Sequence, residues 1–147
     1  MPAQDNSRIA RRMYESFNTR DLDAAVADVD RNAEWLDVPS GQRLRGPQGW
    51  KQNSQNWLTA FPDGKIEIRN VAEAGNQVII EFIGRGTQSG VLNGPGGQII
   101  QPTGRRVEVQ FCDVLEVRDG KLVAGRTYYD MVTILNQLGL MPSRLAA

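Results

Sequence analysis

The first part of the chain carries hydrophobic residues at a helical spacing. Ile9, Met13 and Phe17 follow one another every four residues within residues 5–19, and most of the positions between them are polar. This stripe is typical of an amphipathic helix that buries one face. The pattern therefore predicts a first helix over residues 5–19.

Two further helices are expected before the chain changes character. Residues 21–29 predict a short helix, and Asp21 is a suitable N-cap because its carboxylate can accept hydrogen bonds from the first backbone N–H groups. Pro47 suits the first turn of a third helix, and Pro62 marks the point before which this helix ends. All the predicted helices but the last thus lie in the first part of the chain.

From residue 65 onward, hydrophobic residues alternate with polar ones, which is the period of a β-strand. Residues 65–88 predict a hairpin that turns at Gly75-Asn76. Residues 104–130 predict a second hairpin that turns at Asp119-Gly120, a pair of residues that favours a type I′ turn. The second half of the chain is therefore expected to form an antiparallel sheet.

Two segments complete the predicted fold. Residues 84–104 hold seven of the fifteen glycines, and this composition indicates either a long hairpin loop or a mobile flap. Residues 131–139 predict a closing helix. Because helices come first and hairpins follow, the expected fold class is α+β, with the helices packed on one face of the sheet.

Composition limits the classes of protein to which the chain can belong. Its 147 residues fit one domain, residues 1–147. Lysine plus arginine equals aspartate plus glutamate, 17 against 17, so nucleic acid is not an expected partner. The densest apolar stretch, residues 78–83, is far shorter than the roughly 18 residues of a membrane span, and the N-terminus shows no signal peptide. We expect a soluble cytoplasmic protein with no membrane partner.

The chain contains no histidine and one cysteine, Cys112. One cysteine permits neither an intrachain disulfide nor a zinc site made of thiolates. The lack of histidine excludes a Ser-His triad and the usual imidazole ligands of metals. Acid–base chemistry must therefore come from carboxylates, tyrosine, lysine, the thiol or water, and no metal or cofactor is expected.

The most informative residue is Asp113. Within residues 107–117 the odd positions are apolar except for this aspartate, so Asp113 is expected on the apolar face of a strand. Burial without a partner raises the pKa of a carboxyl group, and a protonated acid can donate a hydrogen bond to a substrate oxygen. The alternative is a structural pairing, for which Arg85, Arg126 and Tyr14 are the candidates.

A second aspartate has a similar setting. Ala33, Trp35 and Asp37 alternate along a short predicted strand and share one face. Asp37 is either a general base or the cap of the Pro-Ser-Gly turn that follows it. Two acids in surroundings of different polarity titrate at different pH, which provides one pocket with an acid and a base.

Several segments of the chain resemble the SnoaL-like polyketide cyclases (ester cyclases) of the NTF2-like superfamily. They are RRMYESFNTRDLDAAVADV with AEWLDVP, then RGPQGW with a helix that ends in AFPD, and then PTGRRVEVQFCDVLEVRDGKLVAGRTYYD with ILNQLGL. The resemblance covers nearly the whole chain. It implies a curved antiparallel sheet wrapped around helices, a conical apolar pocket, and a homodimer or homotetramer that forms through the exposed face of the sheet.

The resemblance also implies roles for individual residues. The acid–base aspartate of the polyketide cyclases falls on Thr127, which cannot replace a carboxylate in proton transfer, and their histidine falls on Asp113. The ketosteroid isomerases of the same superfamily match differently, because their base falls on Asp37 and their protonated acid on Asp113. Their first-helix tyrosine aligns with Met13, one place before Tyr14.

These observations lead to an enzyme hypothesis. The protein would bind a small, apolar, carbonyl-containing ligand and move a proton next to the carbonyl, as in a cyclase, isomerase or lyase, without a cofactor. The expected catalytic residues are Asp37, Asp113 and Tyr14. The expected substrate-binding residues are Trp35, Trp57, Phe82, Phe111, Thr127 and Tyr129.

Two alternatives stay open. One is a non-catalytic module for ligand binding or assembly, which the threonine at position 127 and the lack of histidine favour. The other is a limonene-type epoxide hydrolase in which Glu81 or Asp113 activates water. That chemistry needs an arginine between two acids, and Arg85 and Arg126 are its candidates.

Overall fold

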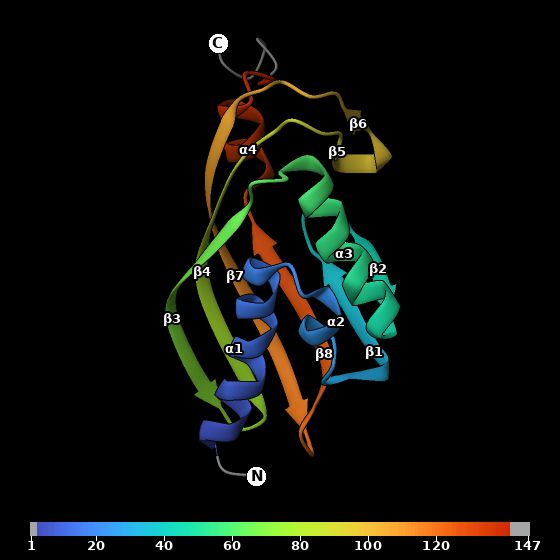
Figure 1. The fold of residues 1–147 in the computed structure, drawn as a ribbon, viewed down its shortest axis with the longest axis vertical. Helices are drawn as coiled ribbons and strands as arrows, with labels where there is room; N and C mark the ends of the chain where they lie inside the picture. Colours follow the sequence, from blue (N-terminus) through green and yellow to red (C-terminus); the bar gives the residue numbers. More distant parts are fainter. Residues whose placement is uncertain (1–2, 142–147) are drawn as a thin grey trace.

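A curved sheet of six strands wraps around helices and forms the main wall of the protein (Figure 1). The computed structural model describes residues 3–141. In chain order its elements are α1 (Ala3–Thr19), α2 (Leu22–Ala25), β1 (Val29–Asp37), β2 (Gln42–Arg45), α3 (Gly46–Ala60), β3 (Lys65–Ala74), β4 (Gln77–Thr87), β5 (Leu92–Asn93), the 3₁₀ turn η1 (Pro95–Gly97), β6 (Ile99–Ile100), β7 (Arg106–Arg118), β8 (Lys121–Tyr129) and α4 (Met131–Gln137).

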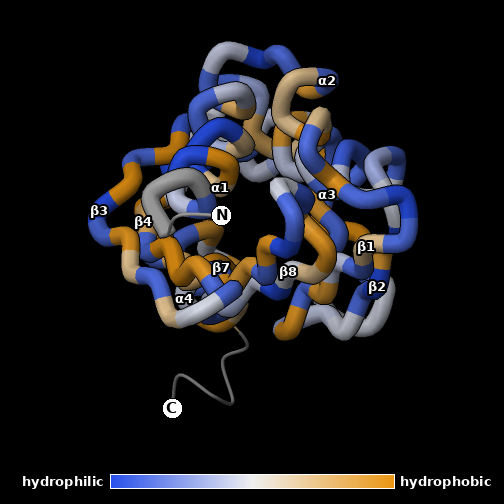
Figure 2. The backbone as a smooth tube through the Cα atoms, turned by 90° about the horizontal axis from the view of Figure 1, so that it is seen from below, coloured by the Kyte–Doolittle hydropathy of each residue, from blue (hydrophilic) through white to orange (hydrophobic). Residues whose placement is uncertain are grey.

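The predicted α+β class is confirmed. The strands of the large sheet follow the order β2-β1-β8-β7-β4-β3. Seen end-on, they form an arc whose open side is closed by α1, α2 and α3 (Figure 2). The helices and the inner face of the sheet thus enclose a common interior.

Both predicted hairpins are present. β3 pairs with β4, and β7 pairs with β8, each in an antiparallel register. At the second turn, Asp119 and Gly120 have φ values of 49° and 76°. Positive φ at both central residues is what a type I′ turn requires, so local sequence chemistry determines this connection.

The first strand departs from the prediction of a purely antiparallel sheet. β1 pairs with β8 in parallel and with β2 in an antiparallel register. It also begins earlier than expected, so the helix predicted over residues 21–29 is reduced to α2. The predicted cap is present, because the Asp21 side chain accepts a hydrogen bond from Ala24 N at 3.1 Å.

The glycine-rich segment 84–104 is tied down at its base by Gln88, which is completely buried. The Gln88 side chain donates to the carbonyl oxygens of Gly90 and Gln101, each at 3.1 Å, and its Oε1 accepts from Thr103 N at 3.0 Å. Leu92 at the start of β5 is buried in the core. The long-loop alternative therefore describes this segment, which also contains the short hairpin of β5 and β6.

Two groups of buried residues make up the hydrophobic core. The larger group includes Tyr14, Trp35 and Phe82, and the smaller one includes Val107 and Ile134 near α4. Phe111 of β7 packs against both groups. The space between these groups is where a ligand site is found.

The outer face of the sheet has a different character. There Arg85 forms ion pairs with Glu67 at 2.6 Å and with Glu108 at 2.5 Å. Cys112 lies half-buried on the same face, as its alternation with Asp113 predicts. The association of copies of the chain through this face stays a prediction.

Candidate active site

Three polar residues of the inner face lie in one row across neighbouring strands. In the sheet register Asp113 of β7 is the partner of Thr127 of β8, and Thr127 is the partner of Asp37 of β1. Directly opposed residues have Cβ atoms about 5 Å apart in an antiparallel pair and point to the same face. All three side chains are buried. The row therefore places two carboxyl groups in the interior on either side of one hydroxyl.

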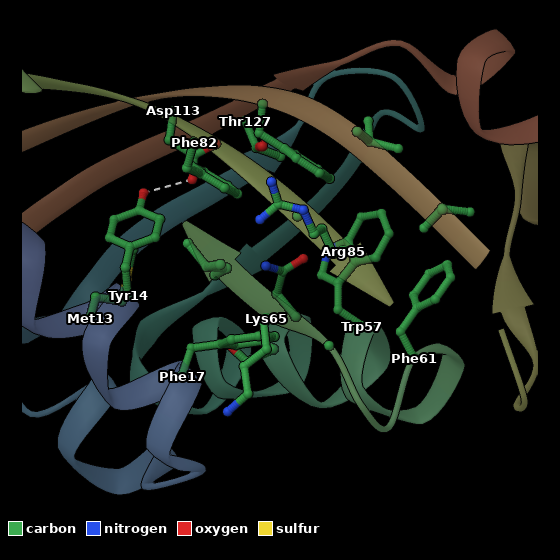
Figure 3. A pocket seen from close by; sticks show the side chains of 18 of the residues that line it. Met13, Tyr14, Phe17, Trp57, Phe61, Lys65, Phe82, Arg85, Asp113 and Thr127 are labelled. Carbon is green, nitrogen blue, oxygen red and sulfur yellow. Dashed lines mark hydrogen bonds between the residues drawn. The ribbon is translucent and has the colours of Figure 1, made fainter. Parts of the chain in front are cut away.

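A cavity of about 900 Å³, counted out to its open mouth, lies against this row. Asp113 and Thr127 line it, together with side chains from α1, α3 and α4. Aromatic rings, among them Trp57, Phe61 and Phe82, form part of the wall around them (Figure 3). An apolar hollow with a few converging polar groups is typical of a small-molecule site.

Asp113 is the acidic residue of this cavity. It is 3% exposed, and its Oδ2 accepts a hydrogen bond from the Tyr14 hydroxyl at 2.6 Å (Figure 3). Its Oδ1 has no hydrogen-bond partner among residues 3–141. The Thr127 hydroxyl lies close enough to lower the pKa of Asp113, although its geometry is not that of a hydrogen bond to Oδ1. One carboxyl oxygen is thus buried with its hydrogen-bonding capacity unused by the described residues.

The surroundings of Asp113 change its acidity. Burial raises its pKa from 3.8 to about 7, the nearby Thr127 hydroxyl and the hydrogen bond from Tyr14 oppose this rise, and the charge of Asp37 adds to it. No arginine or lysine is hydrogen-bonded to it among the described residues, since Arg85 and Arg126 make their contacts on the outer face. Of the structural partners considered from the sequence, Tyr14 is the one that binds it.

Tyr14 is positioned by the buried face of α1. Its ring packs against Phe82 with the ring centroids 5.2 Å apart, and the side chain is 3% exposed. Burial, followed by the neighbouring charge of Asp113, raises the pKa of Tyr14 well above its ordinary value. Tyr14 is therefore a hydrogen-bond donor at neutral pH. The helix turns this residue, and not Met13 alone, toward the cavity.

Asp37 is buried but does not line the cavity. Its Oδ1 and Oδ2 accept from the Tyr129 hydroxyl at 3.0 and 3.1 Å, and Oδ1 also accepts from Ser40 N at 3.1 Å. It therefore caps the turn after β1, one of the two roles considered for it. The structure does not bring Asp37 together with Asp113 on the cavity wall, and its role as a general base stays a prediction.

The residues expected to bind substrate divide in the same way. Five of the six line the cavity, namely Trp35, Trp57, Phe82, Phe111 and Thr127. The rings of Phe82 and Phe111 are stacked with centroids 4.9 Å apart and planes within 3° of each other. Tyr129 stands behind this wall, where its ring contacts Trp57 and Phe111. It supports the wall without lining the cavity.

The sequence analysis missed Asn53 and Ser54 of α3 among the polar residues of the cavity, and it did not place Lys65 and Arg85 there, which also line it (Figure 3). Asn53 and Ser54 lie between Trp50 and Trp57, three to four residues from each, so they share the helical face of these two tryptophans. That spacing was visible in the sequence. Polar residues on a helix are usually solvated, however, and the pattern alone gave no reason to place them inside.

In the part of the chain that the structure describes, no cluster of three or more cysteine, aspartate or glutamate side chains is arranged to hold a metal ion. Within the same residues, none of the helices has the length and hydropathy needed to cross a membrane. Glu81, the alternative water-activating residue, is exposed, and its carboxylate accepts from Asn70 at 3.0 Å.

Comparison with solved structures supports the fold. IdmH from Streptomyces antibioticus, a protein assigned to the polyketide cyclases, is 30% identical, with 91% of this chain and 98% of that one covered and a TM-score of 0.74. A protein from Jannaschia sp. CCS1 that is assigned as a SnoaL-like polyketide cyclase is 18% identical, with 97% of each chain covered and a TM-score of 0.81. A protein of ketosteroid isomerase-like fold from Catenulispora acidiphila is 17% identical, with 92% and 95% covered and a TM-score of 0.75.

Sequence comparison leads to the same family. No sequence among the curated proteins is similar enough to be recognised as a relative. The family model described as SnoaL-like polyketide cyclase, however, matches residues 7–138, nearly the whole chain. This chain therefore belongs to the SnoaL-like polyketide cyclase family.

Proposed function

We propose that the protein is a cyclase or isomerase that transfers a proton next to the carbonyl group of a small, mostly apolar ligand, with Asp113 as the acid–base residue. The observation that carries this proposal is the state of one carboxyl group. Asp113 lies in an apolar cavity, one of its oxygens has no partner among the described residues, and burial raises its pKa to about 7. A group of this pKa is populated in both protonation states near neutral pH, which suits general acid–base catalysis.

The chemistry follows from the two oxygens of Asp113. Oδ1 of the ionised carboxylate accepts a proton from the carbon next to the ligand carbonyl, and the electron pair of that C–H bond passes into an enolate. In a cyclase, the enolate carbon forms a bond to a second carbonyl carbon of the same ligand. The alkoxide formed there takes the proton back from Asp113. In an isomerase, the proton returns to another carbon of the enolate system.

Tyr14 fits this scheme as a positioning residue. Its hydroxyl donates to Oδ2 at 2.6 Å, which leaves Oδ1 to face the ligand. The same bond stabilises the ionised form of Asp113 and so lowers its pKa against the effect of burial. In this scheme Thr127, which also lines the cavity, contacts the ligand oxygen through its hydroxyl.

The threonine at position 127 does not argue against catalysis in this arrangement. Asp113 and Thr127 are directly opposed in the register of β7 and β8. A carboxyl group on either residue therefore reaches the same region of the cavity. We infer that Asp113 supplies here the acid–base group that the resemblance to the polyketide cyclases assigns to position 127.

The proposal is tested by exchange of ligand protons for deuterium. Panels of ketones, including steroid ketones and anthraquinone precursors, are incubated with the protein in D₂O, and loss of the proton signal next to the carbonyl is followed by NMR. We expect exchange with the wild type and a loss of at least about a hundredfold with Asp113→Asn, the lower range of a general acid–base contribution. Ligands that bind without exchange would instead favour a non-catalytic binding module.

A further inference from the structure

The cavity has two buried ends of different chemistry. One end holds Asp113, Tyr14 and Thr127, and the other is formed by Phe61, Val107 and Ile134. Figure 3 shows Asp113 and Tyr14 at one side of the cavity and Trp57 and Phe61 at the other. We call the second group the apolar end. The catalytic scheme above uses only the first end and leaves the apolar end without a role.

The mouth of the cavity lies between these two ends. Many of the lining residues that are partly exposed come from α1, α3 and the start of β3, among them Phe17, Asn53 and Lys65, and Gly84 and Arg85 of β4 lie next to them in the sheet. Ile66, next to Lys65, pairs with Gly84, and Gly84 pairs with Val109 of β7. This level of the sheet falls between Asp113 and Val107. A ligand that enters here can extend in both directions.

β7 gives the length of the space. Four successive inner residues of this strand line the cavity, at positions 107, 109, 111 and 113. Six residues of extended strand span about 20 Å. The distance from the carboxyl group to the apolar end therefore exceeds what a small ketone needs to reach Asp113.

A glycine keeps the space beside the strand open. Gly84 lines the cavity next to Phe111, and a Cβ atom at this position would lie 3.0 Å from the Phe111 ring. Any larger side chain would have to displace that ring. The glycine thus allows the cavity to continue from the stacked rings of Phe82 and Phe111 toward Val107.

The apolar end is closed by a fixed wall. α4 supplies Ile134, which is 1% exposed. The Gln137 side chain of α4 accepts from Glu108 N at 2.7 Å and donates to Glu108 O at 2.9 Å, so the helix is bonded to the backbone of β7. The three side chains that form this end, Phe61, Val107 and Ile134, are apolar. A ligand group placed there must be apolar and of limited length.

We propose that the apolar end is a tail subsite, and that the ligand is an elongated molecule with its reacting carbonyl at one end and an unsubstituted chain or ring at the other. The chain or ring lies along β7 between Phe111 and Ile134. This inference rests on the proposed function only in that the carbonyl is placed at Asp113. It adds that the protein selects its substrate by the length and polarity of the part that does not react.

The test uses methyl ketones whose straight alkyl chain grows from ethyl to nonyl, with binding followed through tryptophan fluorescence. We expect binding to tighten by about fourfold for each added methylene, the value of its burial, and to level off when the chain reaches α4. A hydroxyl at the far end of the longest chain should weaken binding, because the subsite offers it no partner. Affinity that does not depend on chain length would overturn the tail subsite.

Val107→Phe gives the second arm, because its larger ring fills the apolar end. It should weaken binding of the longest ketone by at least about tenfold, which corresponds to the loss of one to two buried methylenes. The affinity for the ethyl ketone should stay unchanged. Val132→Phe is the matched control, since Val132 is 50% exposed on the same helix as Ile134. If Val107→Phe does not fold, Val107→Ala serves instead and should move the levelling-off to longer chains.

The outcomes separate the subsite from the catalytic proposal. Equal affinity of wild type and both Val107 variants for the long ketones would show that the chain leaves through the mouth, which overturns the subsite. Deuterium exchange on the short ketones would be unaffected by that result. If the wild type catalyses no deuterium exchange but its affinity for ketones still rises with chain length, the catalytic role of Asp113 is contradicted and the tail subsite is retained.

Discussion

Asp113 of β7 and Asp37 of β1 lie in the same row of the sheet with β8 between them, yet their surroundings differ. Both are buried, at 3% and 5% exposure. Asp37 accepts from two donors, because the single Tyr129 hydroxyl lies 3.0 and 3.1 Å from its two oxygens and Ser40 N donates to Oδ1. Asp113 accepts one hydrogen bond, from Tyr14, and its second oxygen is buried without a partner among the described residues. The two side chains are therefore similarly buried, but they differ in the number of hydrogen-bond donors around their carboxyl groups.

This difference separates a structural carboxylate from a chemically useful one. A carboxylate whose oxygens already accept from protein donors has little left to offer a ligand. Asp113 has fewer donors, burial raises its pKa to about 7, and one of its oxygens is unpartnered among the described residues. The reaction proposed above therefore uses Asp113, whereas Asp37 binds the Tyr129 hydroxyl and caps the turn after β1.

The largest expected effect is on turnover. Asp113→Asn should lower the rate of deuterium exchange by about 10²–10⁴-fold, because the amide can no longer take up a proton. Asp37→Asn should lower it by less than about tenfold, through a loosened Tyr129, and should reduce the melting temperature instead. Rates measured by NMR on the same ketone, at equal protein concentration, compare the two variants directly.

The control for this comparison is ligand binding. Both variants should bind the ketone with an affinity close to that of the wild type, so that a lost rate reports lost chemistry. A rate loss in Asp37→Asn as large as in Asp113→Asn would restore the two-acid scheme in which Asp37 is the base. Our assignment of separate roles would then be wrong.

The next largest effect is expected on the pH dependence of the free energy of unfolding. The pKa of Asp113 is raised in the folded state to about 7, so the folded protein binds a proton that the unfolded chain has already released above pH ~4. The associated stability is fully present below pH ~4 and is lost as the pH rises to ~7, by at most about 4 kcal/mol. Urea unfolding at pH 5 and pH 8 should show this fall in the wild type.

Asp113→Asn removes the titrating group and should flatten that part of the profile. The variant is expected to be more stable than the wild type at pH 8, because no charge is buried there. A variant that is less stable at pH 8 than the wild type would mean that the ionised carboxylate is well satisfied in the fold. The contrast with Asp37 would then disappear.

Much of this comparison could be anticipated from the sequence, but its decisive part could not. Alternation with period two placed both aspartates on buried faces, and the Asp-Gly pair fixed the turn between β7 and β8. The number of donors around each carboxylate depends on residues far away in the chain. Tyr14 is 99 residues from Asp113, and Tyr129 is 92 residues from Asp37.

The same reason explains the error in the sheet. The pairing of β7 with β8 is local, because a two-residue turn sets its register. The parallel pairing of β1 with β8 joins Asp37 to Thr127, and no turn connects these residues. Local patterns state which face a residue takes, whereas the neighbours across that face follow from the packing of the whole sheet.

A smaller effect is expected from the partner of Asp113. Tyr14→Phe removes the donor to Oδ2 and should raise the pKa of Asp113 further, because the hydrogen bond favours the ionised form. At neutral pH the exchange rate should fall by about tenfold and recover as the pH is raised. Tyr128→Phe, on the exposed outer face, is the control. A fall that is the same at every pH would indicate a packing role for Tyr14.

The smallest effect is expected from a change on the outer face of the sheet. Acidic side chains there are exposed to water and paired with arginine, whereas Asp113 is buried and hydrogen-bonded to Tyr14. Glu108 of β7 is exposed, and Arg85 lies 2.5 Å away. Water and the guanidinium both stabilise its charge, so Glu108→Gln should leave the exchange rate and its pH dependence as in the wild type. A shifted pH profile in this variant would mean that charge on the outer face reaches the cavity through the strand, and that burial and the neighbours inside the cavity do not alone set the pKa of Asp113.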